Sequence, residues 1–212
     1  MGRSAAKPWR RFERLRLGRP WCEALILDDG RRLIQRPIEP GDAEILRRSF
    51  GDLTPEEIRF RFLHPVTELT EEHARRLASV DRQGSFALVV VEALPPERAR
   101  IGAVARCVIE NGGEADFAVI VGREIGGFGL GHHLVDRLVE WCRKKRLALI
   151  RGDIMLENER MLRLVDDLDF RLLARPGEPG MIRAVRTLHA KRDANVPAGS
   201  AVTPPSSEAR RP

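Results

Sequence analysis

The sequence predicts one domain of the α/β (α+β) class, built on a mixed, mostly antiparallel sheet with flanking helices. The apolar patterns run in the order strand hairpin, three helices, antiparallel strands, and then β-α-β-α-β-β. Glycine-containing turns separate neighbouring strand-like runs, which is typical of antiparallel pairing. The 212 residues are enough for one domain with its own core, and no internal repeat divides them.

The first half of the chain is expected to form a hairpin and then three helices. Residues 24–38 predict two short strands that turn at Asp29-Gly30, a dipeptide that favours tight hairpins. Residues 40–42 then introduce a helix that runs to about residue 50, with Asp42 as its expected cap. Thr54 caps the next helix, which has proline at its first position and acidic residues in its first turn, and Thr70 starts a third helix that reaches about residue 80.

The second half is expected to alternate strands with two longer helices. Residues 86–91 and 101–109 are apolar, β-rich runs, and a turn at 111–113 leads into a strand over 115–121. A helix is then predicted by apolar residues at helical spacing, namely Leu130, Leu134, Val135, Leu138, Trp141 and Cys142. A strand over 147–155, a helix over 159–168 and a closing hairpin of 170–174 with 181–188 complete the domain.

Basic residues concentrate at the two ends of the chain. The net charge is +6, but residues 1–21 hold seven Lys or Arg against one acid, and residues 190–212 hold four against two. The stretch between them keeps 26 basic and 28 acidic residues. We therefore expect a basic, mobile arm over 1–21, the folded domain over 22–189 and a disordered tail over 190–212. The slightly acidic middle argues against a nucleic-acid-binding domain.

The remaining composition excludes further classes of protein. No apolar run approaches the roughly 20 residues that a membrane helix needs. Cys22, Cys107 and Cys142 are widely spaced and odd in number, so each is expected to be a small buried apolar residue in a reducing cytoplasm. His132 and His133 have no further ligands nearby. We therefore expect no metal, and we expect both histidines on the solvent side of their helix.

A glycine-rich loop lies where the predicted strand over 115–121 gives way to a helix. The loop consists of Gly126, Gly127, Phe128, Gly129, Leu130 and Gly131. Glycines let a ligand approach the backbone closely, and the N–H groups and dipole of a helix N-terminus favour an anion. The loop therefore predicts a site for a phosphate or pyrophosphate, with a glycine-rich turn that binds nothing as the alternative.

Two common phosphate-binding patterns do not fit this loop. A dinucleotide fingerprint that starts at Gly127 would need a glycine at the position of His132. A nucleotide-triphosphate loop would need Gly-Lys-Ser/Thr, whereas the chain has Gly131-His132-His133. The ligand is therefore expected to be a different phosphate-containing molecule.

The loop resembles the acyl-CoA-binding motif of the GNAT superfamily of N-acyltransferases. In that motif, Gln/Arg-x-x-Gly-x-Gly/Ala, backbone amides at a helix start hold the CoA pyrophosphate. Gly129 and Gly131 match the two small positions. The leading polar position falls on Gly126 and the usual basic position on Phe128, so this chain would hold the phosphates by its backbone alone.

The resemblance covers residues 33–188 and implies the GNAT fold, in which two parallel strands splay apart to admit pantetheine. Glu56-x-x-x-x-Arg61-Phe62 is similar to a helix in the GNAT domains of bacterial protein lysine acetyltransferases. Asn158 and Met161 match a second CoA-side motif, and Asn158 is also a plausible N-cap. The CoA contacts that the resemblance implies are Val119, Val121, Gly126, Gly127, Phe128, Gly129, Leu130, Gly131, Asn158 and Met161.

Acyl transfer to an amine needs a base, because a lysine amine has a pKa of about 10.4 and must lose a proton before it attacks. The protein-lysine branch has Ala-Glu-Phe-Ala-Val on the strand before the loop, and this chain has Asp116 in place of the glutamate. Burial or a relaying water must help so short an acid; a carboxylate that only faces solvent is the alternative. The amide of Val119 or Val121 is expected to stabilise the oxyanion. The chain has no tyrosine, and Val165 stands near the position of the family's tyrosine acid.

The leading hypothesis is an acetyl-CoA-dependent N-acetyltransferase that acts, as a monomer or homodimer, on a primary amine. A protein lysine is the expected acceptor. The alternative is a regulatory module that binds acyl-CoA without turnover, because the short carboxylate, the absent tyrosine and the irregular loop all depart from the family pattern. A third hypothesis, a nucleic-acid-binding protein, is supported only by the basic ends of the chain.

Overall fold

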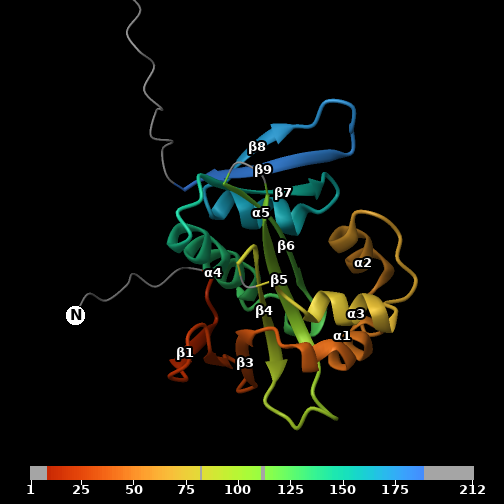
Figure 1. Cartoon of the computed structure of the whole chain (residues 1–212), viewed down its shortest axis with the longest axis vertical. Helices are drawn as coiled ribbons and strands as arrows, with labels where there is room; N and C mark the ends of the chain where they lie inside the picture. The colour runs from red at the N-terminus through yellow and green to blue at the C-terminus, as the bar shows by residue number, and fades with distance from the viewer. Residues whose placement is uncertain (1–8, 82, 111–112, 189–212) are drawn as a thin grey trace, which may run out of the picture.

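Nine strands form a single sheet in the computed structural model, which describes residues 9–81, 83–110 and 113–188 (Figure 1). In spatial order they are β1 (Phe12–Arg16), β2 (Glu23–Leu27), β3 (Arg32–Pro37), β4 (Ser85–Glu92), β5 (Ile101–Glu110), β6 (Glu114–Val121), β7 (Leu149–Met155), β9 (Met181–Thr187) and β8 (Arg171–Ala174). Within this sheet β6 and β7 run parallel, and the other neighbours pair antiparallel. The predicted mixed, mostly antiparallel sheet is confirmed.

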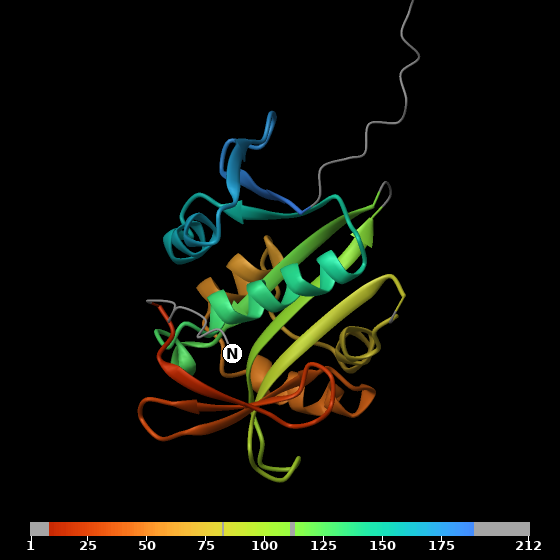
Figure 2. The ribbon, with the colours of Figure 1, turned by 90° about the vertical axis from the view of Figure 1, so that its left-hand side faces the viewer.

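Helices cover both faces of this sheet. The helices are α1 (Ala43–Phe50), α2 (Pro55–Phe62), α3 (Glu71–Ala78), α4 (Leu130–Lys144) and α5 (Glu159–Asp167), with short 3₁₀ turns η1 (Pro40–Asp42) and η2 (Arg123–Ile125). Helices α1 to α3 lie on one side, and α4 lies across the other side of β4 to β6 (Figures 1 and 2). In the described part of the chain, no helix is long and apolar enough to cross a membrane.

The two-sided covering explains the continuous apolar run in β4. Phe86, Leu88 and Val90 pack into the core beneath α4, whereas Val89 and Val91 pack into the core beneath α1 to α3. A strand that is buried on both faces needs apolar residues at every position rather than at alternate ones. The sheet between the two cores is therefore a rigid support for whatever its edges carry.

The predicted helix starts differ in how they are capped. Thr54 and Glu57 form a reciprocal capping box at α2, in which the Thr54 hydroxyl accepts from the Glu57 N–H at 3.1 Å and the Glu57 carboxylate accepts from the Thr54 N–H at 2.8 Å. Asp42, by contrast, makes no side-chain cap at α1. Its carboxylate accepts two hydrogen bonds from the Arg36 guanidinium, at 2.6 and 2.7 Å, and so ties β3 to the helix entry.

The N-terminal segment corrects one expectation. We expected a mobile arm over residues 1–21, but Phe12–Arg16 forms the edge strand β1, paired antiparallel with β2. Only Phe12 of its five residues is buried, so the strand lacks the alternating pattern that would have predicted it. Residues 1–8 of the expected arm, and the tail expected over 190–212, lie outside the described residues.

Strands β6 and β7 pair only where they begin, as the splayed arrangement requires. Their partners are Glu114 with Leu149, Ala115 with Ile150, and Asp116 with Arg151. Beyond this point β6 follows β5 and β7 follows β9, so the two parallel strands separate.

Gly152 lies at the point of separation, directly against Phe117. A Cβ added to Gly152 would be 2.9 Å from the Phe117 carbonyl oxygen and 2.8 Å from its ring. Any side chain at this position would therefore push the two strands apart where they still touch.

We predict that Gly152→Ala lowers the free energy of unfolding by about 1–3 kcal/mol, the usual cost of overpacking a tight site. Urea denaturation measures it. Gly41→Ala is the matched control, because a Cβ added there meets nothing within 4 Å. Equal stability of the two variants would show that β6 and β7 do not need this close approach.

Candidate active site

The glycine loop leaves a row of backbone donors without partners. Gly127 and Gly129 have φ values of +81° and +82°, which turn the chain from η2 into α4. Among the described residues, no acceptor is found for the N–H groups of residues 127 to 132, and Gly129 provides no side-chain cap to α4. Six consecutive free donors at a helix N-terminus make an anion site.

Three of the four glycines in the loop, Gly127, Gly129 and Gly131, have different surroundings. A Cβ added to Gly129 would overlap the carbonyl oxygen of Trp9, and one added to Gly131 would be 2.7 Å from the side chain of Leu164. A Cβ added to Gly127 would meet nothing within 4 Å. Packing within the protein therefore requires glycine at 129 and 131, whereas Gly127 faces open space.

The segment before β1 lies directly on the loop, which the sequence did not predict. The Arg11 N–H donates to the Phe128 carbonyl at 3.1 Å, and the Trp9 ring stacks on His132 with ring centres 4.7 Å apart. The red N-terminal segment runs beside the start of α4 in Figure 2. The segment before β1 therefore helps to hold the loop in place.

Phe128 takes the place of a basic residue, yet arginines surround it. The guanidinium carbons of Arg11 and Arg31 lie 5.4 and 5.5 Å from the centre of its ring, within the range of cation–π contacts. Both arginines also pair with acids of the β2–β3 turn, Asp28 and Asp29. The ring is thus fixed in place, and the positive charge near the loop is partly neutralised.

The second CoA-side motif lies beside the same loop. The Asn158 side-chain oxygen accepts from the Met161 N–H at 3.1 Å and so caps α5, as the sequence predicted. Leu164 of α5 contacts Gly131, and His132 Nε2 is 2.8 Å from Asp167. Helix α5 is therefore packed against the start of α4.

His133 is buried, which corrects the expectation that it faces solvent. Its side chain is 4% exposed, and its Nε2 is 3.2 Å from a carboxylate oxygen of Glu23, which is also close to Arg137. Burial lowers the pKa of His133, so its neutral form is favoured. Strands β1 and β2, which cover this face of α4, are the reason that helical periodicity alone misplaced it.

Asp116 lies at the last paired position of β6 and β7, and its carboxylate makes no hydrogen bond among the described residues. Arg151 is 3.9 Å away, but its guanidinium also pairs with Glu110 and Glu114. Two nitrogens of Arg183 are both 2.8 Å from Asp153. The neighbouring cations are therefore held by other acids, and the Asp116 carboxylate is left open.

This environment makes Asp116 a stronger base than an ordinary aspartate. Partial burial raises its pKa from 3.8 to about 6, and the charges of Asp153 and Glu110 act in the same direction. Arg151 and Arg183 oppose the shift without cancelling it. At neutral pH the carboxylate is still mostly ionised, which is the state that a general base needs.

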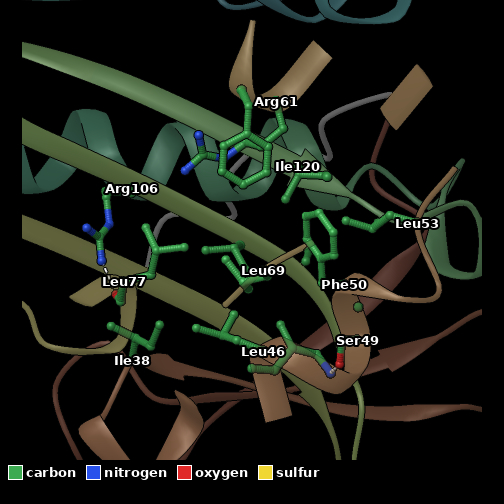
Figure 3. Close-up of a pocket in the computed structure, with 15 residues that line it drawn as sticks. Ile38, Leu46, Ser49, Phe50, Leu53, Arg61, Leu69, Leu77, Arg106 and Ile120 are labelled. Carbon is green, nitrogen blue, oxygen red and sulfur yellow. Dashed lines mark hydrogen bonds between the residues drawn. The ribbon is translucent and has the colours of Figure 1, made fainter. Parts of the chain in front are cut away.

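A cavity opens on the same face of the sheet, beneath α2 (Figure 3). Ile120, four residues along β6 from Asp116, contributes to its wall, as do Phe50 and Leu53. Its space is about 620 Å³, including the part that is open to solvent. Two arginines, Arg61 and Arg106, bring charge to an otherwise mostly apolar lining.

Metal ligation finds no support in this region. Among the residues that the structure describes, no three His, Cys, Asp or Glu side chains are grouped to hold an ion.

A protein-family model matches most of the sequence of this chain. The acetyltransferase (GNAT) domain family matches residues 32–171. The chain therefore belongs to the GNAT acetyltransferases. The strand β6, the glycine loop and the helix α4 described above lie within the matched residues.

Particular relatives agree with the family. The chain is 29% identical to "Acetyltransferase PA5475" of Pseudomonas aeruginosa over 127 residues, 60% of this chain and 67% of that protein. The GNAT domain of S. lividans PAT superposes with a TM-score of 0.69 at 22% identity, covering 79% of this chain and 97% of that one. yncA from Salmonella typhimurium, solved with its cofactor acetyl-CoA, gives a TM-score of 0.59 at 19% identity, with 77% and 99% covered.

We predict that Gly129→Ala destabilises the protein more than Gly127→Ala. Both positions have the same left-handed φ, so both variants bear a backbone strain of about 1–2 kcal/mol. Only the Gly129 variant must also displace the backbone of Trp9, which adds about 1–3 kcal/mol. Urea denaturation compares the two, and equal losses would show that the segment before β1 does not hold the loop.

Proposed function

We propose that this acetyltransferase transfers an acetyl group from acetyl-CoA to a primary amine, and that the amine is a protein lysine. The arrangement of β6 carries the proposal. Among the described residues, six N–H groups without an acceptor follow its end, its edge over residues 117–121 has no strand partner on the β7 side, and Asp116 marks the point where pairing stops. A long, narrow cofactor can lie along this free edge with its thioester near the base.

The CoA phosphates would be bound by the backbone of the loop. The N–H groups of residues 127 to 132 supply the donors for the pyrophosphate, without help from side chains at Gly126 or Phe128. Asn158 uses its oxygen to cap α5, so its amide nitrogen is available to the cofactor arm. Met161 on α5 lies partly buried near the same end of α4 and would pack beside the pantetheine.

The chemistry requires one proton to leave the acceptor amine. Asp116, directly or through a water, takes that proton, and the neutral amine attacks the thioester carbonyl carbon. An N–H of β6, that of Val119 or Val121, stabilises the negative charge that develops on the carbonyl oxygen. The C–N bond forms, the C–S bond breaks, and CoA leaves as a thiolate.

The thiolate takes its proton from water rather than from a side chain of α5. The sequence contains no tyrosine, and Val165, near the position of the family's usual acid, is fully buried. A thiolate is a good leaving group, so the absence of this acid is compatible with turnover.

Support for a protein lysine comes from the motifs shared with the protein-lysine branch. The run from Ala115 to Val119 carries an acidic residue at the same place, and Arg61-Phe62 ends α2 as in that branch. The similarity of the fold to the GNAT domain of S. lividans PAT is in keeping with this acceptor.

The phosphate site can be tested by charge at Gly127. Asn and Asp both tolerate a left-handed φ, and a Cβ added here meets no protein atom within 4 Å. We predict that Gly127→Asp weakens acetyl-CoA binding at least tenfold more than Gly127→Asn, because only the former puts a negative charge beside the phosphates. Isothermal calorimetry measures both. Equal affinities would place the phosphates elsewhere.

The base can be tested by the pH dependence of thiol release from acetyl-CoA with lysine peptides. We predict that kcat/KM rises as the pH passes about 6, where Asp116 loses its proton. Asp116→Asn should remove this rise and lower the rate about 10²–10⁴-fold. An unchanged profile in the variant would assign the base to another group. Binding of acetyl-CoA without any thiol release would make the protein a binding module.

The same variant has a predicted effect on stability. Folding raises the pKa of Asp116, so the folded state holds this proton more tightly than the unfolded chain does. The protonated carboxylate therefore contributes to stability in full below pH 3.8, and this contribution is lost as the pH rises through about 6. Asp116→Asn should therefore raise the Tm relative to the parent at pH 8 and have much less effect at pH 4. A lower Tm at pH 8 would show that the ionised carboxylate stabilises the fold.

A further inference from the structure

The cavity beneath α2 is an apolar space with a positive side. None of the described residues that line it is acidic. Its one lining hydroxyl, that of Ser49, already accepts from the Ile101 N–H at 2.9 Å. Figure 3 shows Arg61 and Arg106 towards one side of the space, with Ser49 and Leu53 towards the other.

The two arginines differ in what they bind. Arg106 donates to the carbonyl oxygen of Leu77, which closes one end of the cavity. The side chain of Arg61, in the last turn of α2, makes no hydrogen bond or ion pair among the described residues, and its guanidinium carbon lies 5.1 Å from the centre of the Phe62 ring. The neighbouring Arg59, by contrast, pairs with Glu157 outside the cavity.

The surroundings of Arg61 favour an incoming anion. Burial lowers the pKa of Arg61 to about 10, and the charge of Arg106 lowers it further, while Asp116 acts in the opposite direction. The group remains protonated at neutral pH but has lost most of its water without gaining a counter-ion. A cation in this state binds a matching anion more strongly than an exposed arginine does.

We propose that Arg61 binds a carboxylate carried by one of the two substrates of the acetyl transfer proposed above. The planar guanidinium fork matches the two oxygens of a carboxylate. Two sources have this chemistry. One is an acyl group that ends in a carboxylate, and the other is an acidic side chain next to the acceptor lysine.

The position of the cavity brings such a carboxylate close to the reaction. Asp116 and Ile120 lie on the same face of β6, and Ile120 lines the cavity. Ile120 belongs to the free edge of β6 along which the thioester would lie, about 13 Å of strand from Asp116, so the cavity opens onto that edge. Apolar residues such as Phe50 and Leu53 would surround the chain that links the carboxylate to the reacting group.

The experiment compares matched substrates that differ by one carboxylate. The acyl arm compares succinyl-CoA with butyryl-CoA on one neutral lysine peptide. The acceptor arm compares lysine peptides that have Glu or Gln beside the lysine, with acetyl-CoA. In each arm the ratio of kcat/KM for the carboxylate-bearing substrate to that for its neutral partner is the readout.

We expect one of these ratios to favour the carboxylate and to fall about 10- to 100-fold in Arg61→Met, the loss typical of one charge-assisted pair. Arg61→Lys should keep part of the preference, because it retains the charge without the fork. The control Arg47→Met, on the exposed face of α1, should leave both ratios unchanged.

The arm that responds identifies the source of the carboxylate. Ratios near one in the parent, or ratios that Arg61→Met and Arg61→Lys both leave unchanged, would overturn the inference. Turnover without any preference for the carboxylate-bearing substrate would refute the role of Arg61 but leave the proposed acetyl transfer intact. The absence of turnover with every thioester would instead refute the proposed function, and this inference with it.

Discussion

The separation of β6 from β7 immediately after Asp116 is the constraint on which the site depends. Gly152 allows the strands to stay paired up to this point, because the absent side chain lets β7 touch the backbone of Phe117 before the two strands diverge. Beyond this point each strand keeps its other neighbour, β5 or β9, so the opening costs few of the sheet's hydrogen bonds. The free edge of β6, the glycine loop at its end and Asp116 at its start are consequences of this one divergence.

The loop that follows β6 is held from outside the core as well as from within it. Leu164 packs on Gly131 from one side, and the backbone of Trp9 covers Gly129 from the other. His132 joins the two sides, because it stacks on Trp9 and pairs with Asp167 of α5. A rigid loop keeps its N–H groups in position before any anion arrives, which reduces the entropy lost on binding.

Charge is distributed unevenly over the face of the sheet that carries Asp116. Arg151 and Arg183 are occupied by other acids, which leaves Asp116 as an open carboxylate with a raised pKa. Arg61, in the last turn of α2, is a cation without a hydrogen-bonding or ion-pair partner among the described residues, in a mostly apolar wall. This face of the sheet therefore has one site suited to remove a proton, on β6, and another suited to bind a negative charge, on the helix that covers it.

The sequence by itself determined the order of the elements, the capping box at Thr54, the glycine loop and Asp116 as the candidate base, because each depends on local pattern or on a short motif. It did not reveal β1, whose single buried residue, Phe12, leaves no periodic signal. The burial of His133, the raised pKa of Asp116 and the absence of an ion-pair partner for Arg61 among the described residues were decided only by the tertiary structure. Each depends on which side chains from distant segments lie nearby and how much water they displace, and a local pattern carries no information about either.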